Sequence, residues 1–374
     1  MNDDSNVSTS KPCDDIVLLA GAGASSYLEL PALDDLLSQA HLGNDDVADR
    51  IRRTRDVIQS EPDRYRIAVF EELIARLIYY LDIAIRLRTD FVFRQELGLL
   101  SHDVDNRIFE QKWKNALTRC YQILIEEYGP KKINSNSEEF RTTLKLLEEL
   151  AKLNSGELHI YTTNYDCSYQ VLASNCKSMS FRTHISNNNG NFTDSWYYAN
   201  HDTESSNLPS VYIHRLHGCV AWFTVSGVTR EEFGTETELT IPHGDNLLNI
   251  KLVASKLIGE NPVLSSAFEE FTIQLQKAKI LFVWGYSFRD LEVLRVINNT
   301  FSIQNDLKIC YLDPYLPINQ VVNNIQRALL SAPILYAPQF RNLVRVNWIP
   351  QDGHEKLIEV VIETLRKELN NVKR

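Results

Sequence analysis

The stretch IVLLAGAGASS, residues 16–26, decides the fold that this sequence predicts. Its first five residues are apolar and have the length of a buried strand. Gly21 and Gly23 follow directly, and two glycines so placed permit a tight turn with close backbone approach. A strand, a glycine turn and a helix in this order are typical of a dinucleotide-binding crossover, where backbone N–H groups face a pyrophosphate. Ser26 stands where such a loop has its third glycine.

Composition places the chain among ordinary soluble globular proteins. Its 374 residues are 44% hydrophobic and 24% charged, with a net charge of −10. A broad nucleic-acid-binding surface would be basic, so we expect no direct nucleic-acid binding. The polar N-terminal segment lacks the apolar core of a signal peptide, and no apolar run is long enough to cross a bilayer. We expect a cytoplasmic protein with no membrane association, a flexible tail over residues 1–13 and one domain over 14–374.

The cysteines do not have the spacing of a structural metal site. No two of the six stand in a C-x-x-C pair, so we expect no metal. Isolated cysteines of this kind usually act as small buried apolar residues.

Apolar periodicity predicts an α/β protein with a large helical insertion. The expected strands are 16–20, 158–163, 211–216, 279–284, 307–312 and 344–348. A helix should follow the glycine turn as far as Leu37, and about 45–153 should be a helical insertion. Residues 174–210 are rich in Asn, Ser and Asp and predict a long loop or a small irregular lobe. Residues 226–270 predict a second insertion of mixed character. Apolar spacing near the end of the chain predicts a closing helix.

The predicted strands end in polar or glycine-containing motifs. Thr162-Thr163-Asn164-Tyr165-Asp166, Leu216-His217-Gly218, residues 285–290 (GYSFRD) and Asp313-Pro314 each follow a strand. Open parallel sheets bind ligands at the carboxyl ends of their strands. The fold class expected is therefore a Rossmann-like, mostly parallel sheet with its site at that edge.

Four of these motifs, in this order, resemble those of the sirtuin-like family, the silent-information-regulator-two superfamily. Residues 21–25 with Pro31 resemble its Gly-Ala-Gly-Ile-Ser…Pro loop, and residues 162–166 resemble Thr-Gln-Asn-Ile-Asp. Residues 216–218 are similar to its catalytic Leu-His-Gly, and 285–287 resemble its Gly-Thr-Ser phosphate segment. The resemblance covers strand ends from about residue 16 to 315 and leaves out the helical insertion and the C-terminal part.

Departures from the family pattern narrow what the resemblance implies. The paired zinc cysteines of protein-deacylating sirtuins are missing, and residues 29–33 (ELPAL) lack the Phe and Arg of Gly-Ile-Pro-Asp-Phe-Arg. This combination is similar to the bacterial defence branch, which hydrolyses NAD to ADP-ribose and nicotinamide in abortive anti-phage responses. The resemblance implies NAD as substrate, a homo-oligomer and, for some members of this size, a HerA-type ring ATPase as partner.

The chemistry of these residue types suits cleavage of the nicotinamide–ribose bond. The leaving group is already cationic, so positioning the ribose and presenting a water matter most. We expect Asn164 to hold ribose hydroxyls or the water, and His217 to accept a proton. Asp166 and Asp290 are candidate supporting residues that orient neighbours or stabilise positive charge.

The resemblance implies a set of NAD-contacting residues on the strand-end loops. Its members are Gly21, Ala22, Gly23 and Ser25 at the pyrophosphate, Gly285 and Ser287 closing over it, and Asp313 at the adenosine ribose.

Other interpretations stand beside this one. One alternative is that the two glycines only make a turn. Another, which is compatible with NAD binding, is that Asn164 is a helix N-cap with Asp166 in the first turn. Two other functions are open: an NAD-dependent protein deacylase, and a nucleotide-binding sensor module without turnover.

Overall fold

The computed structural model describes residues 15–32, 35–40, 45–60, 69–90, 95, 106–185, 192–198, 208–225, 228–231, 262–304, 306–330 and 342–372. The expected tail over residues 1–13 lies outside these ranges. Within them, no helix combines the length and apolar character needed to cross a membrane.

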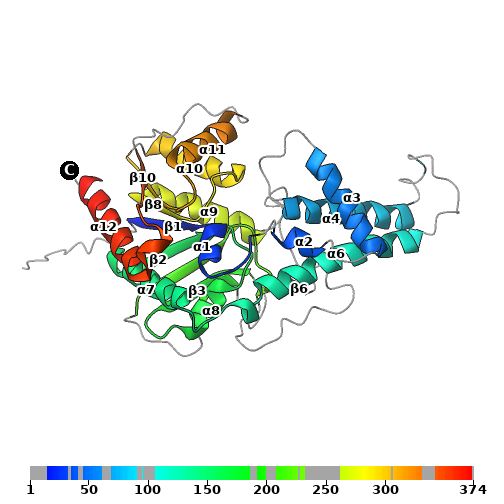
Figure 1. Cartoon of the computed structure of the whole chain (residues 1–374), viewed down its shortest axis with the longest axis horizontal. Helices are drawn as coiled ribbons and strands as arrows, with labels where there is room; N and C mark the ends of the chain where they lie inside the picture. The colour runs from blue at the N-terminus through cyan, green and yellow to red at the C-terminus, as the bar shows by residue number, and fades with distance from the viewer. Residues whose placement is uncertain are drawn as a thin grey trace, which may run out of the picture.

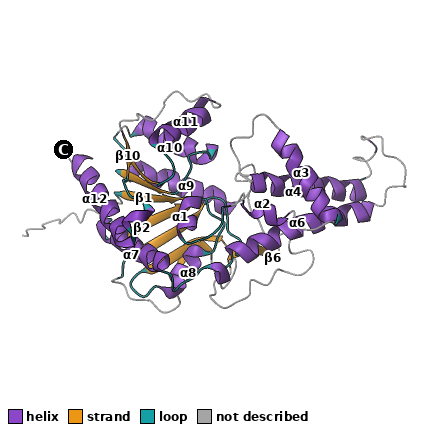
Figure 2. Cartoon of the chain, in the orientation of Figure 1, coloured by secondary structure: helices purple, strands orange, loops and turns teal. Residues whose placement is uncertain are grey.

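An eight-stranded sheet forms the centre of the molecule (Figure 2). Its order is β10-β9-β8-β1-β2-β5-β3-β4, and every neighbouring pair is parallel except β3 and β4. The strands are β1 (Ile16–Ala20), β2 (Glu157–Thr162), β3 (Ser180–Ile185), β4 (Phe192–Tyr198), β5 (Ser210–Arg215), β8 (Ile280–Trp284), β9 (Lys308–Leu312) and β10 (Leu343–Arg345). β6 (Trp222–Val225) and β7 (Val228–Glu231) form a separate hairpin. The prediction of a mostly parallel Rossmann-like sheet is confirmed.

Helices cover both faces of the sheet, which explains why its central strands are apolar throughout. In β1, Ile16, Leu18 and Ala20 pack in one core layer, and Val17 and Leu19 pack in the other. The first layer includes α1 (Ala22–Tyr27), α7 (Glu138–Leu153), α8 (Ser168–Asn175) and α12 (His354–Val372). The second layer includes α9 (Pro262–Lys277), α10 (Leu291–Ile303) and α11 (Ile318–Leu330).

A helical lobe stands to one side of the sheet, at the right of Figure 1. It consists of α2 (Leu36–Ala40), α3 (Asp46–Ser60), α4 (Val69–Thr89) and α6 (Asn106–Tyr128), which pack on one another. It is inserted between α1 and β2, directly after the first βα unit. α6 returns the chain to the sheet, and the short 3-10 helix η2 (Pro130–Lys132) leads to α7, which packs against β2 and α12.

Two sequence-based assignments were wrong. The segment 174–210, predicted as a long loop or a small irregular lobe, contains β3 and β4; the Asn, Ser and Asp residues elsewhere in the segment hid a strand pairing that depends on β5 as a partner. The helix after the glycine turn does not run on to Leu37. It ends at Tyr27, because Glu29 adopts a left-handed φ of 62° and Pro31 follows, and α2 is a separate helix.

Candidate functional site

The sequence motifs meet at the carboxyl edge of the sheet. The loops after β1, β2, β5 and β8 leave four strands that lie side by side in the order β8-β1-β2-β5. Parallel strands place all four loops at the same edge, so segments more than 100 residues apart become neighbours.

The turns after β1 and β8 pack directly on one another. The N–H of Gly21 donates to the carbonyl of Trp284 (2.9 Å), and the N–H of Gly23 donates to that of Gly285 (2.8 Å). A Cβ on Gly21 would lie 2.6 Å from Tyr286 Cα, and one on Gly23 would lie 2.6 Å from Gly285 Cα. The two glycines are therefore needed for turn packing, and their own N–H groups are already donated inside the protein.

Asn164 lies at the centre of a buried hydrogen-bond network. Its side-chain nitrogen donates to the carbonyl of Gly21 (2.8 Å) and to Ser25 Oγ (2.6 Å). Ser25 Oγ in turn donates to Asp166 Oδ2, and Asp166 Oδ1 accepts from the N–H of Ser168 (2.8 Å). Both amide hydrogens are thus engaged, so Asn164 Oδ1 is the atom that can accept from a ribose hydroxyl or a water.

The hydroxyl of Ser25 joins Asn164 to Asp166 in the structure. The contact of Ser25 with a pyrophosphate, which the resemblance implies, stays a prediction. So does the role of Asp166 in orienting neighbours or stabilising positive charge.

His217 and Asp290 form the second part of the site. His217 Nε2 contacts Asp290 Oδ2, and both side chains are largely buried. Asp290 is also the N-cap of α10, where Oδ1 accepts from the N–H groups of Glu292 (2.8 Å) and Val293 (3.2 Å). The carboxylate is fixed by the helix and holds the imidazole by one ring nitrogen. An acidic group that orients a histidine in this way is a recurring arrangement in general base catalysis.

Burial raises the pKa of Asp290, but the charge and contact of His217 and the N–H groups at the start of α10 lower it more, so its pKa is below the ordinary value. Stability that depends on the ionised carboxyl is therefore present above the unfolded pKa of about 3.9 and is lost as pH falls through the folded pKa.

This shift predicts an acid-sensitive contribution to stability. Asp290→Asn keeps a helix cap but removes the ionisable group. Below about pH 4, the free energy of unfolding should fall more steeply with decreasing pH for the wild type than for the variant. Urea denaturation measured from about pH 6 to pH 3 checks this. Parallel curves for the two proteins would contradict it.

Backbone bonds join the Asn164 loop to the His217 loop. The N–H of Leu216 donates to the carbonyl of Thr162 (2.9 Å), and that of Val220 donates to the carbonyl of Tyr165 (2.8 Å). The ring centroids of Tyr165 and His217 are 6.1 Å apart. Asn164 and His217 thus belong to one connected, buried cluster.

The remaining predicted residues lie on the flank of this cluster. Asp313, at the end of β9, accepts from the N–H groups of Tyr315 (2.9 Å) and Leu316 (3.0 Å), so its carboxylate closes its own turn. The carbonyl of Ser287, on the turn after β8, accepts from Asn324 of α11 (2.8 Å). Ala22 opens α1 beside the paired turns. No contact joins Asp313 or Ser287 to Asn164 or His217 among the described residues.

Arg215, which the sequence analysis did not single out, touches the Asn164 loop. It is the last residue of β5 and is 3% exposed. Its guanidinium donates to the carbonyls of Asn164 and Asp166 and to Gln170 Oε1. A cation at the end of a strand that is buried apart from its first residue, two residues before a candidate catalytic histidine, was the signal available in the sequence.

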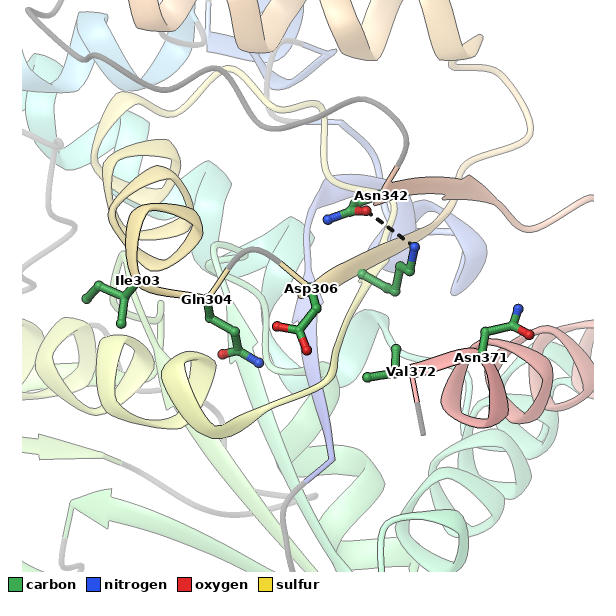
Figure 3. A pocket seen from close by; sticks show the side chains of 7 residues that line it. Ile303, Gln304, Asp306, Asn342, Asn371 and Val372 are labelled. Atoms are coloured by element: carbon green, nitrogen blue, oxygen red, sulfur yellow. Dashed lines mark hydrogen bonds between the residues drawn. The ribbon is translucent and has the colours of Figure 1, made fainter. Parts of the chain in front are cut away.

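A cavity of about 770 Å³ opens near the amino end of strand β9, opposite the carboxyl edge of the sheet (Figure 3). It lies where β9 begins, and Lys308 Nζ donates to Asn342 Oδ1 (3.3 Å) at its lining. β9 runs four residues from Lys308 to its carboxyl end, about 13 Å away. This cavity is therefore separate from the Asn164–His217 cluster. Its lining comprises Ile303, Gln304, Asp306, Lys308, Asn342, Asn371 and Val372.

Among the described residues, no three His, Cys, Asp or Glu side chains are grouped so as to hold a metal ion. Five buried cysteines of that part form no disulfide: Cys120, Cys167, Cys176, Cys219 and Cys310.

Comparison with known proteins leaves the geometry as the guide to function. No protein-family model matches the chain, and a search of curated proteins found no match. The chain is thus an α/β protein with a buried Asn–Ser–Asp network and a His–Asp pair at the carboxyl edge of its sheet.

Proposed function

We propose that this protein is an NAD glycohydrolase, which cleaves NAD to ADP-ribose and nicotinamide. The observation that carries the proposal is the convergence of Asn164 and His217 at the carboxyl edge of a Rossmann-like sheet. This edge is where open parallel sheets bind nucleotides. The order of short motifs that resembles the sirtuin-like family supports the same substrate.

In the proposed reaction, the bond between the ribose carbon and the nicotinamide nitrogen breaks with both electrons leaving on nicotinamide. The ribose becomes oxocarbenium-like, and a water attacks it. Asn164 Oδ1 accepts a hydrogen bond from a ribose hydroxyl or from that water. The proton from the water passes to the imidazole of His217, and the Asp290 carboxylate stabilises the resulting imidazolium.

The dinucleotide would lie across the paired turns, with its pyrophosphate near the segments 21–25 and 285–287. The N–H groups of Gly21 and Gly23 are already donated. The pyrophosphate contacts therefore fall to other groups on these turns. The adenosine ribose would lie toward Asp313 on the neighbouring strand end.

The test is product analysis after purified protein is mixed with NAD. We expect nicotinamide and ADP-ribose in equal amounts, with cyclic ADP-ribose as the alternative product. Asn164→Ala should lower the rate by about 100-fold, because the group that positions the ribose or the water is lost. Asn175→Ala, an exposed asparagine at the end of α8, is the matched control and should react like the wild type.

Two outcomes would overturn the proposal. Nicotinamide release only when an acyl-lysine peptide is added would identify a protein deacylase. NAD binding without products, under every activating condition tested, would identify a sensor module.

The motif resemblance extends the proposal to NAD depletion in anti-phage defence, in a homo-oligomer and with a HerA-type ring ATPase as partner. Assays should therefore include the protein with and without such a partner.

A further inference from the structure

Arg215 is a buried cation whose guanidinium donates hydrogen bonds to the backbone of the candidate site. Its Nη1 donates to the carbonyl of Asn164 (3.2 Å) and to that of Asp166 (2.9 Å), and its Nη2 donates to Gln170 Oε1 (2.5 Å). Removing a guanidinium from water costs several kcal/mol, so its partners must be well placed. Here two of those partners are carbonyls of the loop that carries Asn164 and Asp166.

The planar shape of the guanidinium determines what these bonds do. Its N–H groups point in fixed directions within one plane, so two carbonyls held by it cannot rotate independently. Both residues whose carbonyls are held also place their side chains against Ser25. The orientation of the Asn164 amide is therefore coupled to the position of Arg215.

Arg215 also stands two residues before His217 in the same segment. Backbone bonds at Leu216 and Val220 already join the two loops, so a further link is not required simply to hold them together. The guanidinium also fixes the orientation of the loop backbone at Asn164 relative to the end of β5, which His217 follows.

We propose that Arg215 is a positioning residue that sets the Asn164 amide against His217, so that it supports turnover more than substrate binding. The effect of Arg215 on turnover rests on the proposed function, whereas its stabilisation of the loop that carries Asn164 does not. The effect on turnover and the effect on the loop are therefore measured separately.

The first measurement is steady-state kinetics with NAD. Arg215→Met should lower kcat by about 100-fold, the scale expected for a displacement of about 1 Å in a reacting group, and should change KM by less than about threefold. Arg215→Lys keeps the charge but not the planar fork, so its kcat should lie between those of Arg215→Met and the wild type.

The matched control is Arg182→Met, which replaces an arginine that lies outside the candidate site. Arg182 lies on β3, beside β5, and its guanidinium packs over Tyr212 and donates to that hydroxyl (3.4 Å). Arg182→Met should leave kcat within about threefold of the wild type.

The second measurement is hydrogen exchange of the segment 163–170, which does not depend on activity. Arg215→Met should speed exchange in this segment by tenfold or more, on the order of one broken hydrogen bond, and Arg182→Met should not. Gln170→Ala removes one partner and keeps the guanidinium on the two carbonyls, so it should give a smaller increase. If Arg215→Met does not fold, hydrogen exchange of this segment in Gln170→Ala and Arg215→Lys tests whether Arg215 stabilises the loop.

The outcomes separate the two proposals. Unchanged exchange in Arg215→Lys and Gln170→Ala would overturn the role of Arg215, even if the wild type is fully active. A rise in KM with kcat unchanged would also overturn it. If exchange is faster in these variants but the wild type never releases nicotinamide, the stabilisation of the loop by Arg215 is supported and the proposed function is refuted.

Discussion

His217→Ala is expected to lower the rate of nicotinamide release by about 1000-fold, in the middle of the range for loss of a general base. The side chain is buried and one ring nitrogen is held by Asp290. Its ring lies 6.1 Å, centroid to centroid, from that of Tyr165, which belongs to the loop that carries Asn164. Steady-state rates of nicotinamide release, with NAD at saturation, measure the effect.

Two further variants make this prediction specific. Asp290→Asn still accepts the N–H groups at the start of α10 but no longer stabilises an imidazolium, so a smaller loss of about 10- to 100-fold is expected. His354→Ala removes a partly exposed imidazole at the start of α12 that contacts Tyr27 and Glu139, and should leave the rate within about threefold of the wild type. A His217→Ala rate within about threefold of the wild type would rule out general base catalysis by this residue.

Gly285→Ala is expected to destabilise the fold by about 3 kcal/mol or more. Gly285 has a left-handed φ of 62°, which costs an alanine about 1 kcal/mol. A Cβ there would also lie 2.3 Å from Ala24 N and 2.4 Å from Gly23 Cα, both backbone atoms that cannot rotate away. The paired turns would have to separate, which displaces the segment that carries Ser25. Urea denaturation measures the loss of stability.

Gly353→Ala is the matched control for backbone strain alone. Its φ of 82° is also left-handed, but nothing lies within 4 Å of a Cβ built on it. We expect a loss of about 1 kcal/mol, and the difference between the two variants isolates the close approach of the turns. Equal losses would show that the turns can separate without cost.

The parallel sheet and its candidate site were predictable from the sequence to different extents. The strands β1, β2, β5, β8 and β9 are buried on both faces, so they appear as short apolar runs that sequence reading detects. β3 and β4 were missed because the segment around them is rich in Asn, Ser and Asp and because the pairing of β3 depends on β5.

At the site, residue types were easier to predict than partners. Asn164, Asp166, His217 and Asp290 were singled out because each lies in a polar motif that follows a strand. That Ser25 joins Asn164 to Asp166, and that Asp290 pairs with His217, follows from which strands are neighbours. A single sequence does not contain that order.

The sequence by itself determined the α/β class, the helical insertion after the first βα unit and the candidate residues at strand ends, because apolar periodicity and glycine turns act over a few residues. Tertiary structure alone decided that Gly21 and Gly23 serve the packing of two turns. It also decided that Arg215 holds the Asn164 loop. Both depend on contacts between segments brought together only when the strands align in one sheet.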